Sequence, residues 1–278
     1  MPDLPIITYL LIAVTLFFSY KGFKDRLFFE RYIFEVDGIL IGREYDRLLG
    51  SGFLHVGWAH LLFNMLSLYV FSEILELELG SAYFLLIYFA GLIGGDLLAL
   101  YIHRNHGDYS AVGASGAVCG VIFACIALFP WMRVGFFFIP GSVPGWLFGI
   151  AYVVYTIYGI KSKRDNIGHE AHLGGALVGM LTAIAIEPEA LNYNSRTILA
   201  VLLPTLLFLY LLATRPHLLL IDNIFSRSSR DDYDLEHRVN AEKTKQQREL
   251  DRLLEKISRN GINSLSEKEK QKLKEYSK

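Results

Sequence analysis

Seven stretches of this chain are long, apolar and almost free of charged residues. A run of about 17–25 such residues matches the helix length needed to cross a bilayer core of roughly 30 Å. A soluble domain of 278 residues would instead repeat charges every few positions. We therefore predict an all-α, polytopic membrane helix bundle. The candidate spans are residues 5–21, 54–72, 81–103, 114–130, 145–160, 169–187 and 196–214.

The charged residues lie mostly in the loops and in the tail after Arg215. The net charge of −1 therefore identifies no partner, and no nucleic-acid partner is expected. Cys119 and Cys125 are six residues apart in one apolar segment, too far apart on a helix to pair, so buried free thiols are expected. The first apolar run lacks a basic start and a cleavage site, so we expect it in the mature protein.

The segments between and after the spans differ in composition. Residues 22–53 alternate aromatic and charged side chains, which favours a structure lying in the membrane interface over a plain soluble loop. Pro140 and Pro144 precede the short fifth span and suit a loop that dips toward the bilayer. We divide the chain into a membrane core (1–190), an additional membrane helix (191–214) and a charged extramembrane tail (215–278).

The tail carries helix signals. Tyr233–Ser258 is strongly charged, with apolar residues at helical spacing, and Asn260-Gly261 is expected to end this helix. Ser266-Glu267-Lys268-Glu269 is typical of a capping box that opens another helix. We predict a small helical hairpin outside the membrane, with a solvated spacer as the alternative. The apolar residues are Leu250, Leu253, Leu254 and Ile257.

Three spans open with polar clusters, and polar residues inside spans are costly enough to need a reason. The clusters stand at the starts of spans 2, 4 and 6. Because even-numbered spans of an alternating bundle start on the same side, the clusters should lie at one membrane face and at similar depth. They are His55-Val56-Gly57-Trp58-Ala59-His60 continuing to Asn64, Gly113-Ala114-Ser115-Gly116, and His169-Glu170-Ala171-His172.

Glycine spacing indicates that two of these helices meet. Gly116 and Gly120 in span 4, and Gly175 and Gly179 in span 6, are small-xxx-small pairs that allow backbones to approach closely. The first glycine of each pair lies on the face that carries Ser115 or His172. Packing along these faces could bring the serine hydroxyl within hydrogen-bond reach of the imidazole.

This pairing predicts nucleophilic catalysis. A serine hydroxyl needs a neighbouring base to remove its proton, and histidine suits that role near neutral pH. We assign Ser115 as nucleophile and His172 as general base, and since no carboxylate is placed to orient His172, a dyad fits better than a triad. Gly113 and Gly116 clear space for a substrate backbone.

Oxyanion donors are available from two helices. The Ser115 amide stands in a first helical turn, where amides are unpaired. His60 and Asn64 are four residues apart, hence on one face of span 2, and could donate to the same anion. His55 and His169 are expected to support the site or simply lie near water. Asp96 is expected to be structural or to face a polar cavity. Glu76 lies near the other end of span 2 and is expected to be far from Ser115 and His172.

These residues resemble the signature of rhomboid proteases. The matching motifs are His55-x4-His60-x3-Asn64, Gly113-x-Ser115-Gly116, Ala171-His172-x2-Gly175-x3-Gly179, Arg47 before span 2, and Glu76-x3-Gly80. The resemblance implies a six-helix core that cleaves transmembrane segments of other proteins without a cofactor or metal. Span 7 would be an addition to that core. It also implies Ser115, His172, His60 and Asn64 in the roles given above, and a bacterial inner-membrane location.

The sequence departs from that pattern at two positions. Asp46 precedes Arg47 where the family often has Trp, which bears on how the first loop is anchored. Cys119 stands where an aromatic residue commonly supports the catalytic histidine. Orientation is open as well, because the basic residues of the first loop favour the cytoplasm whereas the family places that loop outside. The oligomeric state, the natural substrate and the tail's role are also open.

Three alternatives remain. A zinc enzyme could use His55, His60, His169 and His172, although His-Glu-x-His lacks the usual i, i+4 spacing and leaves the serine unexplained. A pseudoenzyme would bind membrane helices without cutting, which the retention of both Ser115 and His172 opposes. A transporter is disfavoured because the sequence has no inverted repeat.

Overall fold

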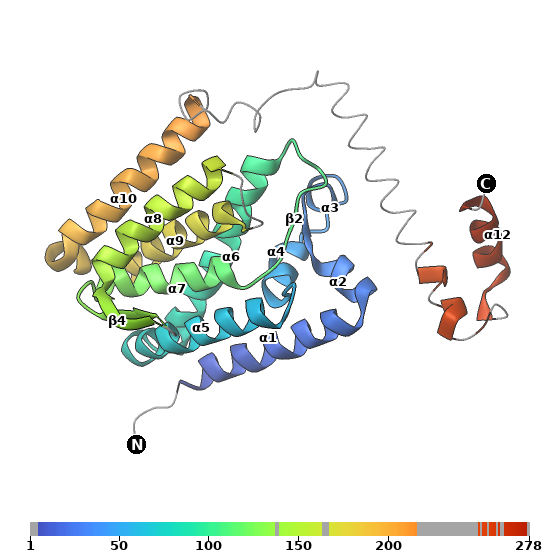
Figure 1. Ribbon diagram of the computed structural model, residues 1–278, viewed down its shortest axis with the longest axis horizontal. Coiled ribbons are helices and arrows are strands. Elements are labelled where there is room, and N and C mark those ends of the chain that lie inside the picture. The colour runs from blue at the N-terminus through green and yellow to red at the C-terminus, as the bar shows by residue number, and fades with distance from the viewer. Residues whose placement is uncertain are drawn as a thin grey trace.

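The computed structural model describes residues 5–136, 139–162 and 167–215, and in the tail residues 250, 252–254, 256–259, 261 and 264–276. A helix occupies each of the predicted spans, and the helices pack into one bundle (Figure 1). They are α1 (Ile6–Lys24), α5 (Trp58–Leu79), α6 (Ser81–His103), α7 (Ser115–Leu128), α8 (Gly145–Ser162), α9 (His169–Ile186) and α10 (Ala190–Thr214).

Helix length and hydropathy confirm the polytopic all-α prediction. Within the described residues, α1, α5, α6, α9 and α10 are long and apolar enough to cross a membrane. Leucine, tyrosine and phenylalanine side chains remain exposed along these helices, as expected where lipid is the solvent. The protein is therefore a multi-pass membrane protein.

Helix α7 lies at the centre of the bundle and is short. It contacts α5, α6, α8, α9 and α10, and every residue from Gly116 to Ala127 is buried. Its 14 residues extend over about 21 Å at 1.5 Å per residue, less than the roughly 30 Å bilayer core. A helix of this length that reaches one membrane face begins about 10 Å below the other. Ser115 is its first residue.

Glycines let α6, α7 and α9 approach closely. A β-carbon added at Gly120 would lie 3.0 Å from the Cα of Gly91 on α6 and 3.1 Å from the carbonyl oxygen of Gly175 on α9. Added β-carbons at Gly175 and Gly179 would meet the backbone of Gly116 and Gly120. The predicted contact between the two glycine pairs is confirmed, and Gly91 is a third participant that the sequence did not reveal.

Glu76 connects the end of α5 to the start of α1. Its carboxylate accepts hydrogen bonds from the amides of Ile7 and Thr8, each at 2.9 Å, and from the hydroxyls of Thr8 and Ser81. First-turn amides lack intrahelical partners, and a negative charge there also complements the helix dipole. Glu76 therefore caps α1 from a distant part of the sequence.

The segment between α1 and α5 is folded around a buried arginine. It contains α2 (Arg26–Tyr32), β1 (Phe34–Glu35), α3 (Val36–Leu40), α4 (Arg47–Gly50) and the 3₁₀ helix η1 (Ser51–Phe53). The fully buried Arg47 donates to the Glu44 carboxylate at 2.5 Å and to the carbonyls of Glu30 and Ile33. Asp46, at the position where rhomboid proteases often have tryptophan, pairs with Arg31 at 2.8 Å. Arg47 thus anchors this segment through one carboxylate and two backbone carbonyls.

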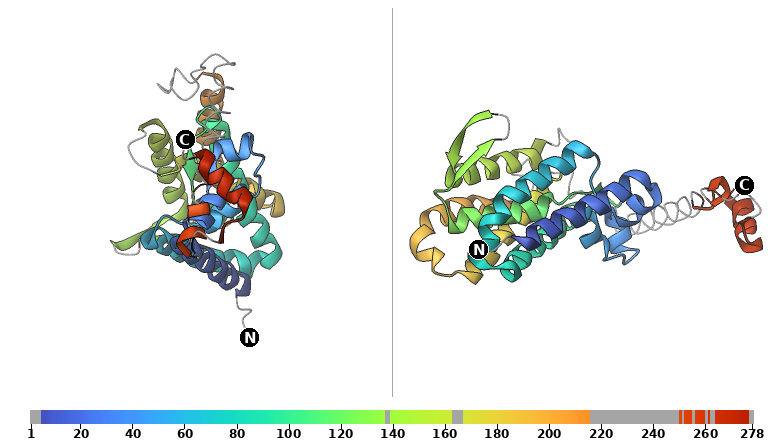
Figure 2. Two further views of the ribbon diagram at one scale, coloured as in Figure 1. Left: turned by 90° about the vertical axis from the view of Figure 1, so that its right-hand side faces the viewer. Right: turned by 90° about the horizontal axis from the view of Figure 1, so that it is seen from below.

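Two connections differ from the sequence predictions. The segment before α8 is not a simple dipping loop but an antiparallel hairpin of β3 (Arg133–Phe136) and β4 (Ile139–Pro144), which projects from the bundle in Figure 2. Helix α10 begins at Ala190, six residues before the expected span. The Asn194 amide donates to the carbonyls of Ala127 and Leu128 at the end of α7, so a polar stretch that looked like a loop is helical.

A second strand pair, β1 with β2 (Ser110–Ala111), joins the segment between α1 and α5 to the connection between α6 and α7.

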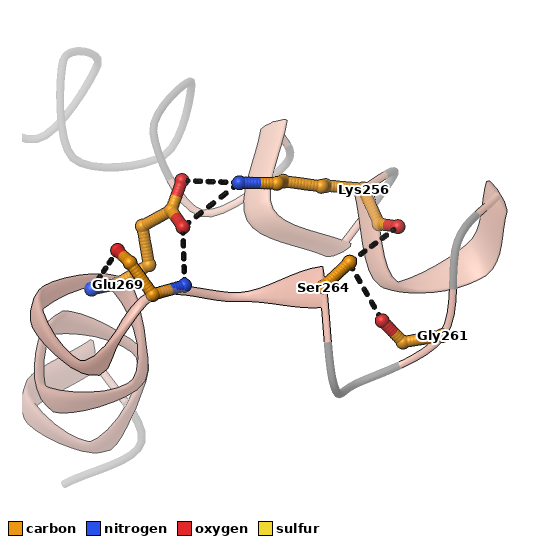
Figure 3. A network of polar contacts seen from close by, with 5 residues as sticks. Lys256, Gly261, Ser264 and Glu269 are labelled. Atoms are coloured by element: carbon orange, nitrogen blue, oxygen red, sulfur yellow. Dashed lines mark hydrogen bonds and ion pairs between the residues drawn. The ribbon is translucent and has the colours of Figure 1, made fainter.

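The described part of the tail confirms the capping box. The amide of Ser266 donates to Glu269 Oε2 at 2.7 Å, and the Glu269 amide donates back to Ser266 Oγ at 3.3 Å, at the start of α12 (Glu267–Tyr276). Lys256, on the preceding helical segment, donates to both oxygens of Glu269 at 2.8 Å (Figure 3). Gly261 has φ +77° and its amide bonds the Ile257 carbonyl. The predicted helix over 233–249 and its stop at Asn260 lie outside the described residues.

Candidate active site

Ser115 and His172 face each other across the α7–α9 contact. His172 Nε2 lies 2.7 Å from Ser115 Oγ, and both side chains are half-buried. Ser115 is the first residue of α7 and His172 is in the first turn of α9, so both come from the same ends of their helices. The Gly116–Gly175 and Gly120–Gly179 approaches described above hold the two helices at the separation that this hydrogen bond needs.

A cavity of about 1050 Å³ surrounds this pair. All three polar clusters contribute to its wall, so the structure brings them together at one cavity. The wall combines apolar side chains with the polar side chains of the three clusters. Among the predicted site residues, the wall includes His60, Asn64, Gly113, Ser115, Gly116, His169 and His172.

The backbone before Ser115 is shaped by glycine. Gly113 has φ +132°, and a β-carbon there would lie 2.9 Å from His60 Nε2 and 2.7 Å from His60 Cε1. The His60 ring therefore lies against the chain two residues before the serine. The Ser115 amide is in the first turn of α7, where no intrahelical acceptor exists, and can point at an anion formed beside Oγ.

His60 and Asn64 line the cavity, and within the described residues neither forms a hydrogen bond to Ser115. The Asn64 amide donates to the His60 carbonyl at 3.0 Å, which leaves its second hydrogen for another acceptor. His60 Nδ1 is buried and has no hydrogen-bond partner among the described residues. The structure thus positions both side chains in the wall while their oxyanion role stays a proposal.

The two weaker histidines have distinct surroundings. The His55 ring lies between α1 and the residue before Ser115, with Nδ1 2.9 Å from Ser19 Oγ and Nε2 3.5 Å from the Ala114 amide. It also meets His60 edge-on, with ring centroids 4.8 Å apart. The His169 ring packs on Gly159 of α8 and lies 6.1 Å from the His172 ring. His55 therefore lies next to the residue before Ser115, and His169 lies next to His172.

Tyr152 is the site residue that sequence reasoning missed. Its hydroxyl, from the middle of α8, lies 3.1 Å from His172 Nδ1 and 3.1 Å from Cys119 Sγ. The aromatic neighbour of His172 is thus supplied by α8 and not by position 119 of α7. A tyrosine inside an apolar span has no local pattern to mark it, and only the Cys119 departure hinted that another residue was needed.

Two buried carboxyl groups border the cavity. Asp96 on α6 accepts a hydrogen bond from Ser51 Oγ at 3.1 Å, and the Ser51 carbonyl accepts from the Gly113 amide at 3.0 Å. Asp96 therefore both faces the cavity and ties α6 to the loop before Ser115. Glu170 lies 3.2 Å from His103 Nε2. Among the described residues, no group of three or more His, Cys, Asp or Glu side chains is arranged to hold a metal ion.

Comparison with known proteins identifies two regions. The Rhomboid domain profile matches residues 42–188, which include Ser115, His172 and most of the residues that line the cavity. Residues 233–278 match a family of unknown function, DUF6576.

Similar proteins come from plants, fungi and bacteria. RHOMBOID-like protein 12 of Arabidopsis thaliana mitochondria is 30% identical over 59% of this chain, and Rhomboid protein 1 of Saccharomyces cerevisiae mitochondria is 34% identical over 48%. Rhomboid protease GluP of Bacillus subtilis is 31% identical over 74%. The aligned regions span 53%, 40% and 40% of these three relatives, so the chain matches about half or less of each.

Proposed function

This chain belongs to the rhomboid family, and from that premise we propose that it is an intramembrane serine endopeptidase with Ser115 as nucleophile and His172 as general base. The observation that carries the proposal is the 2.7 Å contact between Ser115 Oγ and His172 Nε2 in the wall of a cavity inside a membrane helix bundle. Named rhomboid proteases among the relatives support the same reaction class.

The reaction follows from the geometry. His172 Nε2 accepts the Ser115 proton as Oγ attacks a peptide carbonyl, and the proton then passes to the leaving amine. The Ser115 amide donates to the oxyanion, with the side chains of His60 and Asn64 as further donors. Water from the cavity hydrolyses the acyl-enzyme, with His172 again as base. These steps use only the chain's own residues and water.

The proposed substrates are membrane proteins whose transmembrane helices unwind locally. A peptide bond inside an intact helix is enclosed by its own hydrogen bonds, and it reaches Ser115 only after the helix opens. The bundle is a multi-pass membrane protein, and Ser115 begins a helix too short to span the bilayer core. A transmembrane segment is therefore the substrate class that can reach the proposed dyad. The bacterial inner membrane remains the proposed location.

The test is cleavage of a generic transmembrane substrate by purified protein in detergent. Ser115→Ala and His172→Ala should each lower the rate by about 10³-fold or more, because members of a nucleophile–base pair act as a unit. Ser195→Ala, at the start of α10 and outside the cavity wall, is the matched control and should cut at the wild-type rate. EDTA should have no effect.

Each alternative has its own outcome. Inhibition by EDTA would support a metalloenzyme. A wild-type protein that binds the substrate helix without cutting it would support a pseudoenzyme. Undiminished cleavage by Ser115→Ala would remove the basis of the proposal.

A further inference from the structure

Tyr152 joins the proposed dyad to a third helix. Its hydroxyl lies 3.1 Å from His172 Nδ1, on the opposite side of the imidazole from Ser115, and 3.1 Å from Cys119 Sγ. The tyrosine ring is held in place by aromatic neighbours. It stacks on Phe148, with centroids 5.7 Å apart and planes at 26°, and packs against Phe123 on α7 at 5.7 Å.

The direction of these hydrogen bonds follows from the chemistry of the nucleophile. If His172 Nε2 is to accept the Ser115 proton, Nε2 must carry no hydrogen, and in a neutral imidazole the hydrogen then resides on Nδ1. Nδ1–H donates to the Tyr152 oxygen, and the Tyr152 O–H is free to donate to Cys119 Sγ, a weak acceptor. One continuous chain therefore runs from Ser115 through His172 and Tyr152 to Cys119.

We infer that Tyr152 is the positioning residue of His172, so that a neutral tyrosine takes the place that a carboxylate has in a Ser-His-Asp triad. This inference rests on the proposed protease function. When the serine proton moves to Nε2, the hydrogen on Nδ1 stays in place. The Tyr152 oxygen then accepts a hydrogen bond from a positively charged imidazolium, which stabilises that charge. The same contact fixes the tautomer and the ring orientation before the reaction.

The arrangement makes the site depend on three helices. Ser115 is on α7, His172 on α9 and Tyr152 on α8. Tyr152 and Cys119 also join α8 directly to α7, one turn after the nucleophile. A displacement of α8 would thus withdraw the acceptor from Nδ1 while leaving the Ser115–His172 helices packed.

The test compares Tyr152→Phe with Tyr155→Phe. Tyr152→Phe removes one hydroxyl and keeps the stacked ring. Tyr155 is a matched control, three residues later on α8, because its ring also contacts a histidine, His169 at 5.2 Å, while its hydroxyl has no hydrogen bond within the described residues. The readout is the second-order rate of Ser115 labelling by a fluorophosphonate probe, measured in detergent from pH 5 to 9.

We expect Tyr152→Phe to slow labelling roughly tenfold, the effect of losing one hydrogen bond between neutral groups, and to shift the midpoint of the pH profile. Tyr155→Phe should match wild type in both. In ¹⁵N spectra, His172 should show Nδ1 protonated in wild type and a mixture of tautomers in Tyr152→Phe. Melting temperatures of the three proteins should agree.

The outcomes separate the two proposals. Labelling of Ser115→Ala would overturn the protease assignment itself. If Ser115→Ala is inert while Tyr152→Phe keeps the wild-type rate, pH profile and tautomer, the positioning role of Tyr152 is wrong and the dyad stands. A slower Tyr152→Phe with a lower melting temperature and an unchanged profile and tautomer would assign the tyrosine to packing alone, which also overturns the inference.

Discussion

Gly113 shows how a single residue prepares the site. Its φ of +132° lies in a region that side-chain-bearing residues rarely adopt, and the space that a β-carbon would occupy holds the His60 ring. The glycine thus serves two needs, since it turns the chain into α7 and lets a proposed oxyanion donor lie beside the proposed nucleophile. Both needs act within two residues of Ser115.

Replacing Gly113 by alanine should therefore damage activity more than folding. Backbone strain of about 1–3 kcal/mol, relieved by moving either His60 or Ser115, should lower the cleavage rate about tenfold or more. The rate of substrate cleavage and the melting temperature in detergent measure the two effects. Gly57→Ala is the control, because Gly57 has extended backbone with φ −177° and no atom within 4 Å of an added β-carbon. A Gly113→Ala protein with full activity would contradict this account of the loop.

At the scale of helices, close contact between α6, α7 and α9 positions Ser115 and His172, the proposed dyad. In a bilayer the lipid tails are as apolar as the side chains, so helix association depends on packing, and glycines maximise it. The added β-carbon at Gly179 would press on the Gly120 backbone, which cannot rotate away as a side chain can.

Gly179→Val should consequently separate α7 from α9. Overpacking of this kind typically costs about 1–3 kcal/mol, and the loss should appear as a lower melting temperature in detergent. Activity should fall as well, because a shift along this contact lengthens the 2.7 Å Ser115–His172 hydrogen bond. Gly57→Val serves as the comparison outside the contact. Equal melting temperatures for the two variants would mean that the glycine contact is not tight in the protein.

The tail hairpin has its own electrostatic link. Hydrogen bonds from Lys256, together with those from Ser266, lower the pKa of Glu269 from its usual 4.5 to about 2. A carboxyl whose pKa is depressed in the folded state stabilises that state above the unfolded pKa, and the contribution is lost as the pH falls through the folded pKa. The hairpin should therefore be fully supported above about pH 5 and weaken progressively toward pH 2.

Amide hydrogen exchange of the full-length protein over residues 267–276 measures this dependence, after correction for intrinsic exchange rates. Protection in wild type should fall between pH 5 and pH 2, and Glu269→Gln should show lower protection with little change across that range. A Glu269→Gln profile that parallels wild type would assign the pH dependence to other groups.

For the molecule as a whole, the sequence predicted the features that follow helical periodicity and hydropathy. It did not predict the hydrogen bonds that connect residues far apart in the chain. Hydropathy predicted the spans. The polar clusters at the starts of even-numbered spans predicted that Ser115 and His172 would lie at one face of the bundle, and the structure places both in the wall of one cavity. Tyr152, the Glu76 cap on α1 and the early start of α10 at Asn194 each depend on a partner more than 15 residues away. Such pairings leave no periodic signal in the sequence. The polar first residues of α10 therefore looked like a loop, and only the structure shows that carbonyls of α7 accept hydrogen bonds from Asn194. The β3–β4 hairpin was missed because its prolines suggested an irregular loop.

The division between core and tail gives the last prediction. Every residue assigned to the proposed reaction lies between His55 and His172, and the described residues of the core carry the cap on α1, the Arg47 anchor and the glycine contacts. A chain truncated after Arg215 should therefore cleave a generic transmembrane substrate in detergent within about twofold of the full-length rate, since surface changes far from a site seldom alter the free energy by more than about 0.5 kcal/mol. Full-length protein carrying Lys256→Met, which breaks the tail hairpin's ion pair without shortening the chain, is the matched control and should behave in the same way. Loss of activity on truncation, together with normal activity of Lys256→Met and an unchanged melting temperature of the core, would show instead that the tail takes part in substrate cleavage.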